Sequence, residues 1–146
     1  MIETIDEINI EEVVPLIRKY LDFYEVSNID DSKSLEYFSQ FGSSSEKGCL
    51  FGYRFEGKMV AFATVYFSYA SSILSKVGIL NDLYTSEDYR RRGIGTELII
   101  HCEKYARKNG AARLQWLTAS NNKEAQELYN ALGASHSTWE VYTYAI

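Results

Sequence analysis

A short loop rich in arginine and glycine, residues 90–96, separates two segments of regular structure. The apolar run Val77–Tyr84 before it is typical of a strand, and the apolar periodicity of Leu98–Ala106 after it is typical of a helix. A strand, a glycine loop and a helix in this order leave unpaired backbone N–H groups at the helix N-terminus, where the helix dipole also favours negative charge. Three guanidinium groups surround them. A lone Gly-x-Gly is usually a solvated turn, but with these flanking elements the loop predicts a binding site for phosphate oxygens.

Two common phosphate loops are excluded by particular positions. A P-loop requires a lysine directly after its last glycine, and Gly95 is followed by Thr96. A dinucleotide-binding loop requires a third small residue for close helix packing, and that position holds Leu98. No acidic residue ends the following run, Arg113–Thr118, to hold a ribose hydroxyl. Neither nucleotide-binding fold fits this loop.

The composition is that of a soluble globular domain. The chain has 146 residues, the length of one domain, and no apolar run approaches the length of a membrane span. The acidic start is not a signal peptide, and Cys49 and Cys102 lie in separate elements without metal-ligand spacing. We therefore expect a cytoplasmic protein with buried thiols and no metal. The formal net charge of −5 argues against nucleic-acid binding, and an acidic body with one basic cluster suits an anionic cofactor.

The apolar periodicity predicts an α+β fold in a single domain, residues 1–146. Helices are expected at 10–25, from Asp31 or Ser32 to Phe41, at 94–109 and from Asn121 or Asn122 to Leu132, and strands at 49–55, 58–68, 76–84, 113–118 and 139–146. The pair Glu56-Gly57 is typical of a hairpin turn between the first two strands. Together the strands form a mixed, largely antiparallel sheet with helices on both faces.

The loop also matches a family pattern. Arg90, Gly93 and Gly95 occupy the defining positions of Arg/Gln-x-x-Gly-x-Gly/Ala, the pyrophosphate loop of the GNAT N-acetyltransferases, which the chain resembles. The run Leu80–Thr85 looks like the fourth strand of that family. Trp116–Thr118, and then Asn122-x-x-Ala-x-x-Leu-Tyr with Leu-Gly at its end, look like the fifth strand and the fourth helix. The resemblance is close over residues 78–133, and it implies transfer of an acetyl group from acetyl-CoA to an amine.

The resemblance places the cofactor along the loop and the strand before it. The strand is expected to bulge after Asp82, so that the backbone of Leu83, Tyr84 and Thr85 pairs with the pantetheine arm. A backbone N–H of Leu83 or Tyr84 is then the oxyanion donor, while both side chains pack in the core. The residues implied in binding the pyrophosphate are Arg90, Arg91, Arg92, Gly93, Ile94, Gly95 and Thr96. Arg91 stands where many members carry glycine, which reduces backbone freedom but adds a guanidinium.

Three further side chains are implied in the chemistry. Asn122 matches the asparagine that contacts the pantetheine arm, although helix capping competes for it, and Asn121 is a second candidate for the cap. Tyr129 matches the tyrosine near the cofactor sulfur and is expected to act as general acid. Asp82 is a candidate base or anchor for the substrate cation, and a solvated strand-end carboxylate is an equal alternative. His101 and His136 are far from the loop in the motif pattern, and His101, on the predicted third helix, is interpreted as structural or exposed.

The acceptor is expected to be a primary amine of a small molecule, such as a polyamine or an amino acid. The Tyr-x-x-Phe-Tyr pattern at residues 20–24 is similar to the histone/polyamine acetyltransferase-like subgroup of the family. Tyr20, Tyr24, Phe67 and Tyr69 are candidates for an aromatic pocket around a cation, and each is equally suited to the core.

Two other functions stay open at this point. One is acetylation of protein lysines or amino termini, which requires an open peptide groove. The other is a binding module that holds acyl-CoA without turnover. The presence of both Tyr129 and Asn122 argues against such a module.

The C-terminal part departs from the family pattern. The family usually ends with two antiparallel strands, whereas thirteen residues follow Gly133. A truncated end, or a last strand completed by a second subunit, would both account for the exposed sheet edge. The resemblance favours a homodimer.

Overall fold

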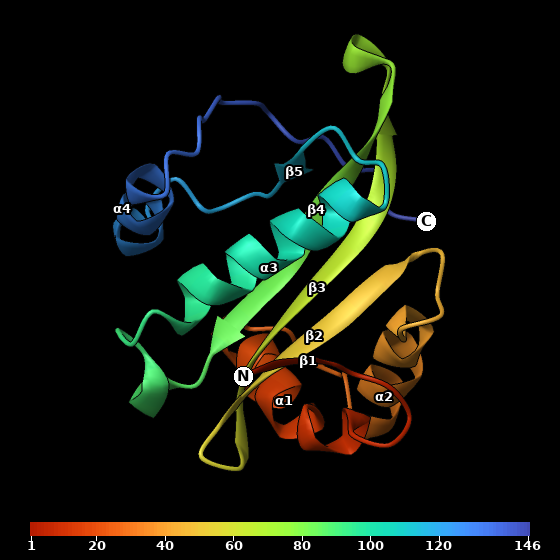
Figure 1. Cartoon of the computed structure of the whole chain (residues 1–146), viewed down its shortest axis with the longest axis vertical. Helices are drawn as coiled ribbons and strands as arrows, with labels where there is room; N and C mark the ends of the chain where they lie inside the picture. Colours follow the sequence, from red (N-terminus) through yellow and green to blue (C-terminus); the bar gives the residue numbers. More distant parts are fainter.

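The fold is built on a five-stranded sheet in the order β1-β2-β3-β4-β5 (Figure 1). We describe it from a computed structural model that covers residues 1–146. The strands are β1 (Ile2–Thr4), β2 (Gly48–Phe55), β3 (Lys58–Ala70), β4 (Ser75–Thr85) and β5 (Leu114–Gln115). The first four pair antiparallel with their neighbours, and β5 pairs parallel with β4. The mixed, mostly antiparallel sheet is therefore confirmed, and β1, whose three residues carry no clear alternation, is an addition to the sequence prediction.

Helices cover both faces of this sheet, as predicted. They are α1 (Val14–Phe23), α2 (Asp31–Phe38), α3 (Ile94–Lys108) and α4 (Lys123–Ala131). Side chains of α3 pack with one face of the sheet around Ala63, Val65 and Leu80, and side chains of α1 and α2 pack with the other face around Leu50 and Phe62. Figure 1 shows α3 running along β3 and β4, while α4 stands apart beyond β5.

The first two helices are shorter than the sequence predicted. A 3₁₀ turn at Ile10–Glu12 precedes α1, because Pro15, in the first turn of α1, has no N–H to continue an α-helical ladder backwards. The cap of α2 is Asp30, whose carboxylate accepts from the Lys33 N–H at 2.9 Å, and neither Asp31 nor Ser32 fills that position. After Phe38 the chain continues as a 3₁₀ turn, Ser39–Phe41.

A bulge in β4 decides which side chains face which helices. Thr64 of β3 pairs with Asp82, and Val65 pairs with Leu80, so that Asn81 is the extra residue. The bulge therefore lies directly before Asp82, and the prediction of a bulge after it was wrong by one position. Because an extra residue reverses the alternation of a strand, Leu80 and Leu83 both face α3, while Tyr84 packs with the α1 side.

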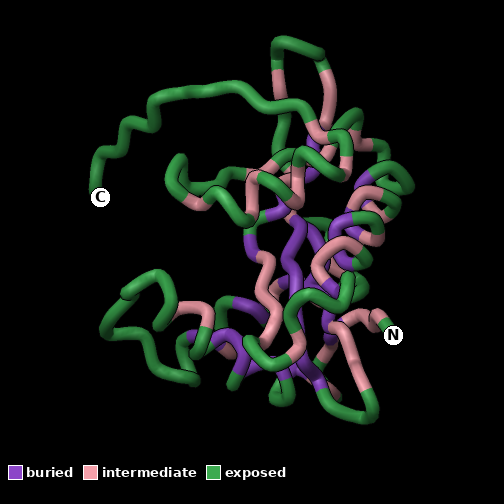
Figure 2. The backbone as a smooth tube through the Cα atoms, turned by 90° about the vertical axis from the view of Figure 1, so that its left-hand side faces the viewer, coloured by how far each residue is buried: buried purple, intermediate pink, exposed green.

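The sheet ends early on its β5 side. β5 pairs with β4 only at Gly78↔Leu114 and Ile79↔Gln115, against the six residues predicted for this strand. The predicted strand at 139–146 does not form, and these residues have no regular secondary structure. Figure 2 shows this exposed segment arcing away from the body, and Trp139 is 83% exposed. None of the helices is both long and apolar enough to cross a membrane.

Candidate active site

A cleft of about 630 Å³ opens where β4 and β5 separate. Beyond Ile79, the outer edge of β4 has no strand partner. The cleft is lined from α1 by Tyr20, Phe23 and Tyr24, from β4 by Leu80, Asn81 and Leu83–Thr85, from the loop and first turn of α3 by Tyr89–Arg91 and Gly93–Thr96, by Trp116–Thr118, and from α4 by Asn122, Glu124, Ala125 and Glu127–Tyr129. Five segments of the chain therefore meet along one open sheet edge.

The loop before α3 presents a row of unpaired donors to this cleft. Arg91 and Gly93 adopt left-handed backbone conformations, with φ of 60° and 79°. The first backbone hydrogen bond of α3 runs from the Glu97 N–H to the Gly93 carbonyl, and the N–H groups of residues 91–96 find no acceptor within the protein. Consecutive free N–H groups at a helix N-terminus form a concave site for an anion.

The three arginines of the loop point in different directions. Arg90 Nε donates to the Thr85 carbonyl at 2.9 Å, which ties the loop to the end of β4. Arg91 pairs with Glu124 of α4 at 3.2 Å across the mouth of the cleft, and both side chains are exposed. Arg92 does not line the cleft, because its guanidinium lies over the rings of Phe55 and Tyr89 at 5.3 and 5.4 Å.

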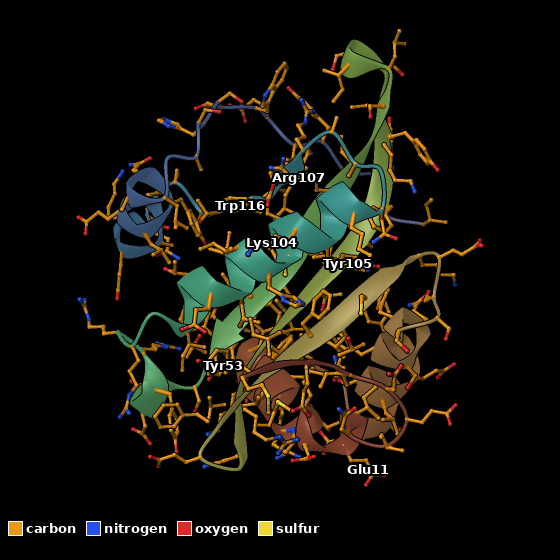
Figure 3. The ribbon with its side chains drawn as sticks, in the orientation of Figure 1. Glu11, Tyr53, Lys104, Tyr105, Arg107 and Trp116 are labelled. Carbon is orange, nitrogen blue, oxygen red and sulfur yellow. The ribbon has the colours of Figure 1, made fainter.

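Tyr129 of α4 lies in the cleft with a hydroxyl that makes no hydrogen bond within the protein. Its ring meets Trp116 edge-on at a centroid distance of 5.2 Å, and Figure 3 shows Trp116 on the segment that joins β5 to α4. Burial, with a smaller contribution from Tyr24, raises the pKa of Tyr129. The hydroxyl therefore stays protonated at neutral pH and is available as a proton donor.

Asn122 is the N-cap of α4. Its Oδ1 accepts from the Ala125 N–H at 3.2 Å, and Asn121 takes no part in the cap. Capping uses only the carbonyl oxygen of the side chain. The Nδ2 group remains free to donate a hydrogen bond into the cleft, so one side chain can serve the helix and a ligand together.

Asp82 does not line the cleft, because the bulge turns its side chain to the α1 face of the sheet. It is 6% exposed. Burial raises the pKa of its carboxyl, opposed by the Tyr20, Asn81 and Thr64 side chains around it. It is therefore a desolvated acid, and the alternative of a solvated strand end is wrong.

The model of the acetyltransferase (GNAT) family matches residues 14–134. The chain belongs to this family. As a GNAT protein it is an acyltransferase by class.

Relatives and solved structures agree with that assignment. YhfO, an uncharacterized N-acetyltransferase of Bacillus subtilis (strain 168), is 27% identical over 130 residues, which cover 89% of this chain and 86% of that protein. The thialysine N-epsilon-acetyltransferase of Bos taurus is 35% identical over 80 residues, 55% of this chain and 46% of that protein. The crystal structure of a probable acetyltransferase superposes with a TM-score of 0.86 at 25% identity, over 100% of this chain and 97% of that one. Aminoglycoside N-acetyltransferase AAC(6')-Iy in complex with CoA shares the fold, with a TM-score of 0.82 at 19% identity over 99% and 93% of the two chains.

Most of the residues expected from the GNAT pattern meet in the cleft, and the four that do not are Asp82, Arg92, Phe67 and Tyr69. Phe67 stacks on Tyr105 of α3 at 5.6 Å, and Tyr69 is 78% exposed near the tip of the β3–β4 hairpin. Odd-numbered positions of β3 in this region face α3, whereas the cleft aromatics Tyr20 and Tyr24 come from α1, on the other face of the sheet, so the rings of Phe67 and Tyr69 do not join them. His101 packs against Phe51 at 4.6 Å, away from the cleft, consistent with a structural role.

The lining residues that were not predicted as site residues include one aromatic and three polar side chains, Phe23, Asn81, Glu124 and Glu127. Phe23 lies within the Tyr-x-x-Phe-Tyr pattern, and its 62% exposure is what marks it as a surface aromatic. Asn81 was hidden because the bulge position was misplaced by one residue. The two glutamates face the cleft because α4 stands away from the sheet, which no local pattern indicates.

The buried Asp82 predicts a gain in stability from Asp82→Asn at neutral pH. A carboxyl whose folded pKa lies above its unfolded value binds more protons in the folded state between those two values, so stability falls as pH rises through that range. The variant removes this cost, and we expect its Tm to rise by a few degrees, since about 1 kcal/mol shifts the Tm of such a domain by about 2–4 °C.

The pH dependence supplies the control for this measurement. Below the unfolded pKa of an aspartate, Asp82 is protonated in both states, and the difference between wild type and variant should vanish there. Thermal unfolding followed by circular dichroism across the acidic range checks both points. A variant that is less stable than wild type at neutral pH would contradict the assigned environment.

Proposed function

We propose that this GNAT protein transfers an acetyl group from acetyl-CoA to the primary amine of a small molecule. The observation that carries the proposal is one cleft in which the free amides of residues 91–96, the open edge of β4 and the Tyr129 hydroxyl are all exposed together. A diphosphate, an extended amide-containing arm and a leaving thiolate are the three chemical features these groups fit. Coenzyme A carries all three.

Different groups of the chain bind different parts of the cofactor. The amides of residues 91–96, with the Arg90 and Arg91 guanidiniums and the Thr96 hydroxyl, bind the pyrophosphate. The backbone of Leu83, Tyr84 and Thr85 is the unpaired strand edge against which the pantetheine amides add as a further strand. The Nδ2 group of Asn122 donates to the same arm.

Separate residues then have separate roles in the acyl transfer. Acetyl-CoA supplies an activated acyl group when bound. A backbone N–H of Leu83 or Tyr84 stabilises the negative charge that develops on the acyl oxygen as the amine attacks. Tyr129 donates its hydroxyl proton to the departing sulfur, a role that fits its raised pKa and its free hydroxyl.

The acceptor end of the cleft suits a small cation. Tyr20, Phe23 and Tyr24 supply aromatic faces, and Glu127 supplies a carboxylate at the same cleft. The names of two relatives, a thialysine N-epsilon-acetyltransferase and an L-ornithine N5-acetyltransferase, describe enzymes of small amines. Protein-lysine acetylation and a non-catalytic acyl-CoA module remain the alternatives. The two buried, unpaired thiols, Cys49 and Cys102, also suit the reducing cytoplasm that we propose as its location.

Tyr129→Phe tests the catalytic part of this proposal. Removing the proton donor should lower kcat by about 10²-fold while the affinity for coenzyme A stays unchanged. The measurement is thiol release over a panel of polyamines, amino acids, aminoglycosides and lysine peptides. Tyr105→Phe, which removes a hydroxyl from α3 outside the cleft, is the matched control and should retain wild-type kcat. Tight binding of acetyl-CoA by the wild type without turnover of any amine would contradict the enzyme proposal and favour the binding module.

Glu124→Gln tests where the pyrophosphate binds. Glu124 forms an ion pair with Arg91 and places a negative charge beside the proposed phosphate site. Its neutralisation should tighten coenzyme A binding by about twofold to fivefold, the range expected when an exposed charge contact of about 0.2–1 kcal/mol is changed. Isothermal titration calorimetry measures the Kd. Glu103→Gln, which breaks a similar exposed pair with Arg107 on α3 outside the cleft, should leave it unchanged. A Kd that weakens in Glu124→Gln would place the phosphates elsewhere.

We further propose that the protein is a homodimer closed by its C-terminal segment. No residue after Ala106 is buried, although α4 is amphipathic and residues 139–146 carry large apolar side chains. Trp139, Tyr142 and Tyr144 are each more than four-fifths exposed. The outer edge of β5 is also unpaired. A segment with strand composition and an open strand edge on the same chain complement each other in a symmetric pair.

Sedimentation velocity tests this assembly. The wild type should sediment at twice the 16.7 kDa mass of the chain. Val141→Pro, which removes a ladder donor from the segment, should shift it to the monomer, and Glu140→Gln should not. A wild type that is monomeric at every concentration would contradict the dimer.

A further inference from the structure

Asp82 is the only acidic side chain buried in the protein, and it has no counter-ion. The five ion pairs of the structure involve Glu3, Glu12, Asp31, Glu103 and Glu124. Asp82 is 6% exposed, and no cation contributes to its environment. An isolated buried carboxylate is costly, and proteins usually pair or neutralise it. A protein that keeps one beside a reaction cleft has a use for its proton affinity.

The groups that face Asp82 come from four elements and are all neutral. From β3, Thr64 lies directly across the pairing register. From β4, Asn81 Nδ2 donates to Asp82 Oδ2 at 3.2 Å. Tyr20 of α1 lies near the carboxyl. Burial, together with the Asp82 charge, raises the pKa of Tyr37 of α2. Thr64 Oγ1 has no hydrogen-bond partner, so the carboxyl is not saturated with donors.

Only two of these neighbours also line the cleft: Tyr20 and Asn81. The amide of Asn81 cannot exchange a proton at ordinary pH, whereas a tyrosine hydroxyl can give one and accept another. Tyr20 is held by edge-on contacts with Tyr24, Phe62 and Tyr84 at 5.0–6.1 Å. Its ring is therefore fixed between the cleft and the buried acid, and it is the one titratable link between them.

We propose that Tyr20 and Asp82 form a proton relay that deprotonates the acceptor ammonium. In this step the ammonium N–H bond breaks and its proton binds Tyr20 Oη, while the Tyr20 hydroxyl proton passes to Asp82 Oδ. Tyr20 is neutral before and after, Asp82 goes from carboxylate to carboxylic acid, and the amine is left neutral for attack. The inference rests on the proposed acetyl transfer and assigns its base.

The environment of both groups fits this division of roles. Burial raises the pKa of Asp82, which makes its carboxylate a better proton acceptor than an exposed aspartate. Burial and the Asp82 charge raise the pKa of Tyr20, so a tyrosinate is not a stable intermediate and the two transfers occur together. The Tyr20 hydroxyl and the Asp82 carboxyl are not joined by a direct hydrogen bond of ordinary length, and the relay requires that this contact tighten when substrate binds, as catalytic hydrogen bonds commonly do.

Three variants test the relay on the amine that the wild type acetylates fastest. Tyr20→Phe and Asp82→Asn should each lower kcat by about 10²-fold, and the double variant should lose no more than either alone, because two members of one relay act in series. Coenzyme A affinity should remain that of the wild type in all three. The pH profile of kcat/KM for the amine should lose its acidic limb in Tyr20→Phe.

Tyr37→Phe is the matched control, since it removes a hydroxyl near Asp82 that does not reach the cleft, and its kcat should be unchanged. Wild-type kcat in Tyr20→Phe, or losses that multiply in the double variant, would overturn the relay and leave the acetyltransferase proposal intact. A wild type that acetylates no amine in the panel would instead overturn the proposed function, and the relay with it.

Discussion

The separation of β5 from β4 after Ile79 is the constraint on which the site depends. A sheet edge inside a folded domain leaves backbone donors and acceptors without partners, and this is usually a liability. Here the open edge from Leu80 to Thr85 lies beside the unpaired amides of residues 91–96. Both sets of groups are backbone, so their positions are held by the sheet and by α3 rather than by flexible side chains. The cleft is therefore preorganised for a long ligand that offers amides at one end and phosphates at the other.

The single extra residue at Asn81 determines which side chains of β4 lie on each face of the sheet. On the α3 side, Leu83 continues the apolar core behind the cleft. On the α1 side, the reversed alternation buries Asp82 beneath Tyr20, where a carboxylate costs stability at neutral pH. A strand without the bulge would direct Asp82 toward Val65 and Leu98, an apolar core with no polar partner. Bulges near reaction sites commonly re-aim a side chain in this way.

Much of the fold was predictable from local patterns, because these follow from burial and backbone sterics. The hairpin at Glu56-Gly57, the strand before the loop and the helix from Ile94 to Lys108 all agree with the sequence analysis within a few residues. The errors concern features decided by partners distant in sequence. β5 pairs with β4 at only two positions, and residues 139–146 have strand composition but pair with no strand.

The same distinction explains the candidate site. The loop residues and Tyr129 were found because fixed spacing along the chain brings them to one helix end and one helix face. Phe67 and Tyr69 were misplaced because a face of a strand depends on register, which composition does not reveal. The contact between Tyr20 and Asp82 depends on the bulge, on α1 and on the sheet at once. No single stretch of sequence carries that information.

A crystal structure with acetyl-CoA tests the central claim most directly. We predict that the pyrophosphate oxygens accept hydrogen bonds from the N–H groups of residues 91–96. The pantetheine amides should pair with β4 between Leu83 and Thr85, and the sulfur should lie within hydrogen-bond reach of the Tyr129 hydroxyl. A cofactor bound elsewhere, or bound with the β4 edge still unpaired, would contradict the account.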